Sequence, residues 1–225
     1  MSLTFKCIGT GSSGNCYVLD HNGDMLLLDL GMAVSKVKKG IDYNIMGIKF
    51  GIAFHGHTDH SKAVEDFKKM GVRVFTPYLD ENPNAVIRIN PFTVSLFRLP
   101  HNGVENRGGY IKVADRRMVY ACDCEYVPYR FFTHRLTDIF IECNYQDKYL
   151  NMDAENIIHK TQGHCSLDTC IEFIKTNLTD ALQNVIILHM GTDTCNANEC
   201  VAEIKKVVPE SVNVDYARAG ETYKL

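Results

Sequence analysis

The sequence lacks the features that would point to a membrane protein, a secreted protein or a zinc ribbon. No apolar run approaches the roughly 18 residues of a membrane-spanning helix, and the first residues do not read as a signal peptide. The nine cysteines include no Cys-x-x-Cys pair and favour no disulfide framework, so most are expected to be buried as small apolar side chains. We therefore expect a cytoplasmic protein with no membrane partner.

An excess of charge of either sign is also missing. The 225 residues carry 24 basic and 27 acidic side chains, which gives a formal net charge of −3. This balance lacks the basic surface of a bulk nucleic-acid binder, but it does not exclude a nucleic-acid substrate, because bound metal ions would add local positive charge. No repeat or low-complexity linker divides the chain. We expect a single domain over residues 1–225, and the oligomeric state stays open.

Apolar runs and their spacing predict a protein that mixes strands and helices. The predicted strands cover residues 3–8, 16–20, 25–29, 48–54, 72–76, 93–99, 110–113, 118–122, 138–142 and 185–188, with a turn at 115–117, and the tail after Pro209 is expected to return to strand. The predicted helices cover residues 61–70, 167–178 and 198–208, and Ser166 is a plausible N-cap of the second helix. This order indicates an α+β protein in which a mixed sheet packs under helices.

The strongest functional signal is the segment 55–60, which reads His-Gly-His-Thr-Asp-His. It follows an apolar strand and precedes a predicted helix. His55 and His57 alternate along an extended segment, so both can reach one ion from the same side. Asp59 and His60 lie on the turn into the helix and can face a second ion. Four ligand-type residues within this short segment predict a metal site.

This His-x-His-x-Asp-His motif resembles the signature of the metallo-β-lactamase-fold hydrolase superfamily. The resemblance implies a four-layer αββα sandwich with metal ions at one edge of the sheets. It also implies three later ligands that each follow a strand, namely a histidine, a bridging aspartate and a last histidine. His101, Asp123 and His189 follow predicted strands in this order and are the expected candidates.

The resemblance divides these residues into two ligand sets that share Asp123. One set is His55, His57, His101 and Asp123, and the other is Asp59, His60, His189 and Asp123. Each oxygen of Asp123 is expected to bind one ion, and the flanking Cys122 and Cys124 are expected to point together into the core. Nitrogen-rich sets with a shared carboxylate suit two divalent ions, Zn²⁺ or Mn²⁺. Such ions would make a metal-bridging hydroxide available for attack on the substrate.

A glycine-rich segment narrows the resemblance to the small WalJ-type exonucleases of this superfamily. Residues 9–16, Gly-Thr-Gly-Ser-Ser-Gly-Asn-Cys, resemble the opening of those proteins, and the glycines would let backbone N–H groups approach a phosphate. Substrate contacts are therefore expected at Ser12, Ser13 and Asn15, although a generic turn between two strands has the same composition. In the family, the residue that matches Asp29 is a buried supporting group and not a ligand.

A second segment, Gly-His-Cys-Ser at 163–166, matches a later motif of the same exonucleases. The resemblance implies that His164 contacts the phosphate or protonates the leaving oxygen, and that Asp59 also takes part in catalysis. The alternative for His164 is a histidine that caps the following helix or is buried for structural reasons.

The sequence thus predicts a dinuclear metal-dependent phosphodiesterase, foremost an exonuclease whose substrate is nucleic acid, and DNA in particular. The short spacing from Asp123 to His164 leaves no room for a β-CASP insert, and no C-terminal helical domain is expected after His189. Two alternatives stay open. One is a small-molecule hydrolase that uses the same metal ions on a thioester, lactone or cyclic phosphodiester. The other is a non-catalytic module that binds metal or nucleotide.

Overall fold

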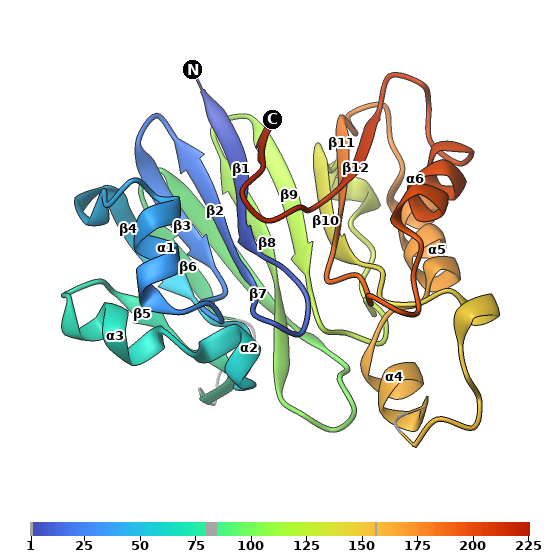
Figure 1. Cartoon of the computed structure of the whole chain (residues 1–225). Helices are drawn as coiled ribbons and strands as arrows, with labels where there is room; N and C mark the ends of the chain where they lie inside the picture. The colour runs from blue at the N-terminus through green and yellow to red at the C-terminus, as the bar shows by residue number, and fades with distance from the viewer. Residues whose placement is uncertain (1, 80–84, 156) are drawn as a thin grey trace.

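Two β-sheets face each other in the computed structural model, which describes residues 2–79, 85–155 and 157–225 (Figure 1). Over these residues the strand order is β13-β1-β2-β3-β4-β5 in the first sheet and β12-β11-β10-β9-β8-β7-β6 in the second. The first sheet contains β1 (Leu3–Gly9), β2 (Cys16–His21), β3 (Asp24–Leu28), β4 (Ile48–Ile52), β5 (Val74–Phe75) and β13 (Thr222–Lys224). The second contains β6 (Val86–Ile89), β7 (Phe92–Leu99), β8 (Asn106–Val113), β9 (Arg116–Ala121), β10 (Asp138–Glu142), β11 (Asn184–Leu188) and β12 (Asn213–Tyr216).

Helices cover the outer faces of both sheets. On the side of the first sheet lie α1 (Val34–Gly40), α2 (Thr58–Ser61) and α3 (Val64–Lys69) (Figure 1). On the side of the second sheet lie α5 (Leu167–Asn177) and α6 (Ala197–Lys205), with α4 (Ile157–Gly163) below them in this view. Short 3₁₀ helices occupy Ile45–Gly47, Pro77–Leu79, Phe132–His134 and Asp147–Tyr149. No helix in the described part of the chain is long and apolar enough to cross a membrane.

The core consists of apolar clusters that match the interfaces between four layers. Phe5 of the first sheet and Phe140 of the second stack between the sheets, with ring centroids 4.2 Å apart. A second cluster joins the second sheet to α5 and α6, where Ile174 and Ile204 are buried. A third cluster joins the first sheet to α1 and α3. The predicted four-layer αββα sandwich is therefore confirmed.

The carboxyl ends of several strands lie at one edge of the sandwich. β3 is parallel to β4, and β9, β10, β11 and β12 are parallel to one another. Asp29 follows β3, Asp123 follows β9 and His189 follows β11, and their φ angles are 59°, 50° and 47°. Residues other than glycine rarely adopt positive φ, and such strain concentrates at functional sites. This edge therefore collects the side chains that the sequence predicts to bind metal.

The helix predicted at 61–70 is instead two short helices, α2 and α3. The N–H of Leu30 donates to the carbonyl of His60 at 2.8 Å, and the N–H of Ala63 donates to the carbonyl of Leu30 at 2.8 Å. These two bonds dock α2 on the segment after β3 and separate it from α3. The predicted buried face is correct for Phe67 but not for Met70, which is 38% exposed.

Two further predictions are wrong in detail. The turn predicted at 115–117 is shorter, because Arg116 already belongs to β9 and pairs with the buried Asp138. Cys122 and Cys124 are both buried, but the first belongs to the cluster between the sheets and the second to the cluster under α5 and α6. They diverge because β9 ends at Ala121, so the alternation of a strand no longer applies. Three further elements, α1, α4 and β6, are not among those predicted from the sequence.

Gly31 lies against the backbone of α2, and a side chain at this position should destabilise the fold. A Cβ atom on Gly31 would lie 1.6 Å from the carbonyl oxygen of Asp59, so α2 would have to shift. We expect Gly31→Ala to lower the free energy of unfolding by about 3 kcal/mol.

Gly23→Ala is the control for this prediction. Gly23 has a φ of 92° with nothing within 4 Å of an added Cβ, so only the conformational cost of about 1 kcal/mol is expected. Urea unfolding measures both values. An equal loss in the two variants would contradict the close packing of α2 on Gly31.

Candidate metal centre

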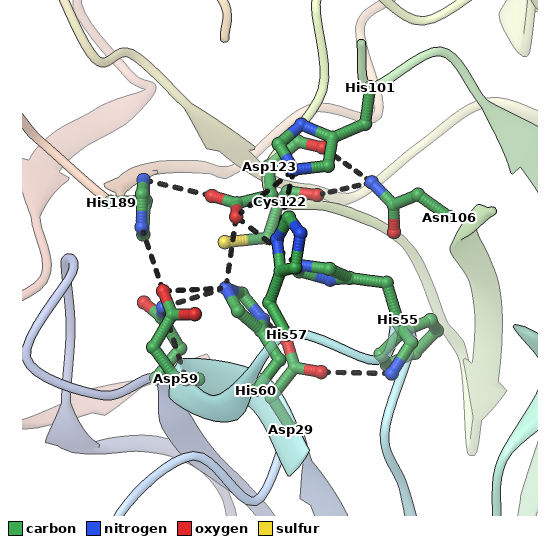
Figure 2. A network of polar contacts seen from close by, with 12 residues as sticks. Asp29, His55, His57, Asp59, His60, His101, Asn106, Cys122, Asp123 and His189 are labelled. Carbon is green, nitrogen blue, oxygen red and sulfur yellow. Dashed lines mark hydrogen bonds and ion pairs between the residues drawn. The ribbon is translucent and has the colours of Figure 1, made fainter. Parts of the chain in front are cut away.

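The residues predicted to bind metal meet at this edge of the sandwich (Figure 2). Among the described residues, several groups have candidate ligand atoms within 4.8 Å of one another, and two of these groups lie here and contain the predicted ligands. The first group is His55, His57, His101 and Asp123, and the second is Asp59, His60, Asp123 and His189. These groups have the same members as the two predicted ligand sets, and Asp123 belongs to both.

Loops and strand ends from both sheets supply the two groups. His55 and His57 follow β4, and the segment continues directly into α2. The second sheet supplies the residues that follow β7, β9 and β11. The two sheets are joined at this point, because His55 forms a backbone bridge with Asn106, and the N–H of Arg107 donates to the carbonyl of Phe54 at 3.2 Å.

The separations within the first group fit the coordination of a small divalent ion. Oδ2 of Asp123 lies 3.2 Å from Nε2 of His55 and 3.7 Å from Nε2 of His101. Nε2 of His101 lies 3.3 Å from Nδ1 of His57. Ligand atoms about 2.0–2.1 Å from a tetrahedral zinc ion are about 3.3 Å apart. The first group therefore has the spacing that such an ion requires.

The second group is similar in its spacing. Nε2 of His60 lies 3.3 Å from Oδ2 of Asp123 and 3.6 Å from Oδ2 of Asp59. Nε2 of His189 lies 3.8 Å from the same oxygen of Asp59. Oδ2 of Asp123 thus contacts histidines of both groups, while Oδ1 lies 3.0 Å from Nδ1 of His189. The sequence predicts that each oxygen of Asp123 binds a different ion. The arrangement differs from this expectation, because Oδ2 lies beside histidines of both groups.

Several ring nitrogens are buried here without hydrogen bonds. Within the described part of the chain, Nε2 of His55 and Nε2 of His189 have no hydrogen-bond partner. A buried polar group left in this state costs about 1–3 kcal/mol. Coordination to an ion would satisfy both nitrogens, so the residues present fit a bound metal pair.

The histidines are oriented through their other ring nitrogen. Nδ1–H of His101 donates to the carbonyl of Gly163 at 2.6 Å, and Nδ1–H of His60 donates to Oδ2 of Asp29 at 2.8 Å. Asp29 also accepts from the N–H of Phe54 at 2.9 Å and from the hydroxyl of Tyr120 at 2.5 Å. Metal-binding histidines are commonly held in this way. Asp29 is the buried supporting residue that the resemblance implied.

Burial and clustered charge shift the pKa values of the centre. Burial lowers the pKa of His55 to about 4. Burial disfavours the charged ring of His60 as well, but Asp29 and Asp123 outweigh it and raise the pKa of His60 to about 10. Burial alone would raise the pKa of Asp123, but the rings of His189 and His60 hold it well below its usual range. A neutral His55 and an ionised Asp123 are the forms that bind metal.

His164 lies beside these groups, and Glu142, which the sequence analysis missed, holds it there. Nδ1–H of His164 donates to Oε1 of Glu142 at 2.7 Å, and its ring stacks on His189 with centroids 5.4 Å apart. Glu142 is fully buried at the end of β10, and the same oxygen lies 3.0 Å from Nδ1 of His189. In the sequence, Glu142 is marked only by its position as a carboxylate at the end of an apolar strand. Asp123 has a similar position two residues after the end of β9.

His164 and Glu142 also extend the set of possible ligands. Asp123, Glu142, His164 and His189 form a further group with candidate atoms within 4.8 Å of one another. Burial disfavours the charged ring of His164, but Glu142 outweighs it and raises the pKa of this histidine. His164 thus lies beside the carboxylates of Asp123 and Glu142 and belongs to the same polar network.

The residues of the glycine-rich loop that are predicted to contact the substrate differ in their exposure to solvent. The residues exposed at the tip of the loop are Ser12 and Ser13. Asn15 is fully buried, and its Nδ2 lies 2.8 Å from Nε2 of His60, so an ion bound to that nitrogen would displace this contact. The loop is tied to the centre a second time, because the N–H of His189 donates to the hydroxyl of Thr10 at 3.0 Å. The loop therefore borders the centre.

Two mixed sheets between layers of helices, with histidines and aspartates at one edge, define the metallo-β-lactamase fold, and this chain has that fold. It is similar to the metallo-β-lactamase fold protein YhfI from Bacillus subtilis, with a TM-score of 0.76 and 18% identity over 100% of both chains. It is also similar to a diphosphatase of the PhnP family, with a TM-score of 0.65 and 13% identity over 100% of this chain and 98% of the other. Human tRNase Z, short form, has a TM-score of 0.65 and 14% identity over 98% of both chains. No protein-family model and no curated protein matches the sequence.

Asp29→Asn tests whether Asp29 supports metal binding through His60. Asparagine has the same shape and tolerates the positive φ, but it lacks the charge that polarises the ring. We expect the affinity for Zn²⁺ to fall about 10–100-fold, measured by competition with a chelator.

Asp138→Asn is the matched control. Asp138 is as buried as Asp29, but it lies at the start of β10, away from Glu142 and the metal centre, and pairs with Arg116. This variant should lose stability while its metal affinity stays the same. Wild-type metal affinity in Asp29→Asn would show that His60 does not depend on Asp29.

Proposed function

We propose that the chain is a metal-dependent phosphodiesterase with two divalent ions, Zn²⁺ or Mn²⁺, and that it removes nucleotides from the ends of DNA as WalJ-type exonucleases do. The observation that carries the proposal is that two donor groups share the buried Asp123 and contain ring nitrogens with no hydrogen bond. One ion would be held by His55, His57, His101 and Asp123, and the other by Asp59, His60, His189 and Asp123.

The reaction follows from these positions. Two bound ions would supply Lewis acidity to the phosphate and a nucleophilic water at neutral pH. Asp59 lies between His60 and His189, where it would hold the second ion and could take up a proton from the attacking water. Glu142 keeps Nδ1 of His164 protonated, and His164 contacts the phosphate or protonates the leaving oxygen.

Two observations support phosphodiesters as the substrate class. Two proteins of similar fold are named as a diphosphatase and a tRNase. The glycine-rich loop, with Ser12 and Ser13 exposed at its tip, borders the candidate metal centre. Backbone N–H groups in such loops bind anions. The choice of DNA rests on the similarity of residues 9–16 and 163–166 to the WalJ-type exonucleases.

A small-molecule hydrolase is the second candidate, and one observation favours it. A cavity of about 490 Å³ adjoins His101, and Glu105 and Glu125 line it. Its described lining includes no lysine or arginine. Glu105 is paired with Arg107 at 2.6 Å, so Glu125 supplies the unbalanced negative charge of this lining. A negative charge in this position would repel a long polyanion and favour a small substrate such as a cyclic phosphodiester, a thioester or a lactone.

His164→Ala separates catalysis from metal binding. Loss of a proton donor or phosphate contact should lower kcat/KM about 10²–10⁴-fold, whereas the metal content stays at the wild-type value. His134→Ala is the control, because this histidine is exposed and packs on Tyr110 away from the centre. Steady-state kinetics and elemental analysis give both readouts, and lost metal in His164→Ala would make His164 a ligand instead.

End-labelled DNA tests the activity itself. The protein loaded with Mn²⁺ or Zn²⁺ should shorten single- or double-stranded DNA progressively from one end, because the ions activate water against the terminal phosphodiester. Asp123→Ala should carry less metal and leave the DNA intact. Intact DNA with wild-type protein that holds its full metal pair would contradict the exonuclease proposal and favour the small-molecule hydrolase.

A further inference from the structure

Three cysteines from separate parts of the chain meet on the helix-covered side of the second sheet. Cys143 directly follows β10, Cys195 precedes α6, and Cys200 lies within α6. Sγ of Cys200 is 3.7 Å from Sγ of Cys143 and 3.1 Å from Sγ of Cys195. All three sulfur atoms lie within 4.8 Å of one another. This thiol cluster shares no residue with the ligand groups around Asp123.

The separations of the sulfur atoms favour a bound ion over a disulfide. A disulfide needs one pair at about 2.05 Å, and it would leave the third sulfur without a role. Sulfur ligands about 2.3 Å from a tetrahedral zinc ion are about 3.8 Å apart. The two separations of 3.1 Å and 3.7 Å are far from the disulfide length and nearer to this spacing.

The surroundings of the thiol cluster allow an ion to enter and favour a thiolate at Cys200. Cys143 and Cys200 are fully buried, whereas Cys195 is only partly buried and opens a path for an ion to enter. Cys200 lies in the first turn of α6, where the positive end of the helix dipole stabilises a thiolate. Two charged neighbours act on Cys200 in opposite directions, since Lys148 favours its thiolate and Glu199 disfavours it.

We propose that Cys143, Cys195 and Cys200 bind a soft metal ion, such as Zn²⁺ or Cu⁺, at a site separate from the His and Asp centre. Soft thiolate ligands select ions of this kind. The ion would tie the end of β10 and the segment between His189 and α6 to the helix. The N–H of Gln146 already donates a hydrogen bond to the carbonyl of Thr194 in that segment, at 2.8 Å. The bound ion thus holds the chain that follows His189.

Cobalt titration of the reduced, metal-free full chain tests this proposal. Co²⁺ bound by thiolates gives a charge-transfer band in the near ultraviolet, and nitrogen and oxygen ligands do not. We expect the band to saturate at one equivalent in Asp123→Ala, which lacks the shared carboxylate of the other centre. Cys195→Ser should abolish the band, and since Cys195 is partly exposed, this change should leave the fold intact.

Cys7→Ser is the matched control, because Cys7 lies in β1 and is buried in the cluster between the sheets, whereas α6 belongs to the cluster on the other face of the second sheet. It should keep the band. A second readout uses the otherwise unchanged chain loaded with Zn²⁺, where Cys195→Ser should lower the zinc content by one ion per chain. The absence of the band from Asp123→Ala, or a zinc content unchanged by Cys195→Ser, would overturn the proposal. A Cys195–Cys200 disulfide formed in the presence of metal would also overturn it.

Discussion

A buried carboxylate is unfavourable unless positive charge or hydrogen bonds surround it, and one edge of this sandwich is arranged around such a group. Asp123 is 3% exposed, and ring nitrogens of His55, His60, His101 and His189 lie 3.0–3.7 Å from its oxygens. These histidines come from both sheets, so the contact between the sheets sets the shape of the centre. Because Asp123 belongs to both donor groups, the two groups form one unit.

The residues that accept hydrogen bonds from the histidines lie outside the two donor groups that share Asp123, and they decide which nitrogen each histidine presents. Asp29, Glu142 and the carbonyl of Gly163 each take the Nδ1–H of a histidine. This arrangement has a cost, since Asp29, Asp123 and His189 all have positive φ, at about 1–3 kcal/mol for each strained residue. The three apolar clusters of the sandwich offset that strain. The fold therefore holds polar groups in place that would not assemble on their own.

Most of the candidate site could be predicted because its ligand-type residues are concentrated in one motif and then follow strands in a fixed order. Glu142 could not, since a glutamate at a strand end is usually exposed, and only the pairing of β10 with β9 and β11 buries it beside His164 and His189. The sequence indicates that Asn15 lies in a loop, but it does not reveal that the amide of Asn15 contacts His60. Helical periodicity also cannot reveal the break between α2 and α3, because bonds to a distant segment cause it.

The central claim is that two ions share Asp123, and the most direct measurement is a crystal structure of the metal-loaded chain with anomalous scattering recorded at the absorption edge of the bound metal. We expect two anomalous peaks within bonding distance of Asp123, one among His55, His57 and His101, and the other among Asp59, His60 and His189. A single peak, or none beside Asp123 in protein with a full metal content, would contradict it.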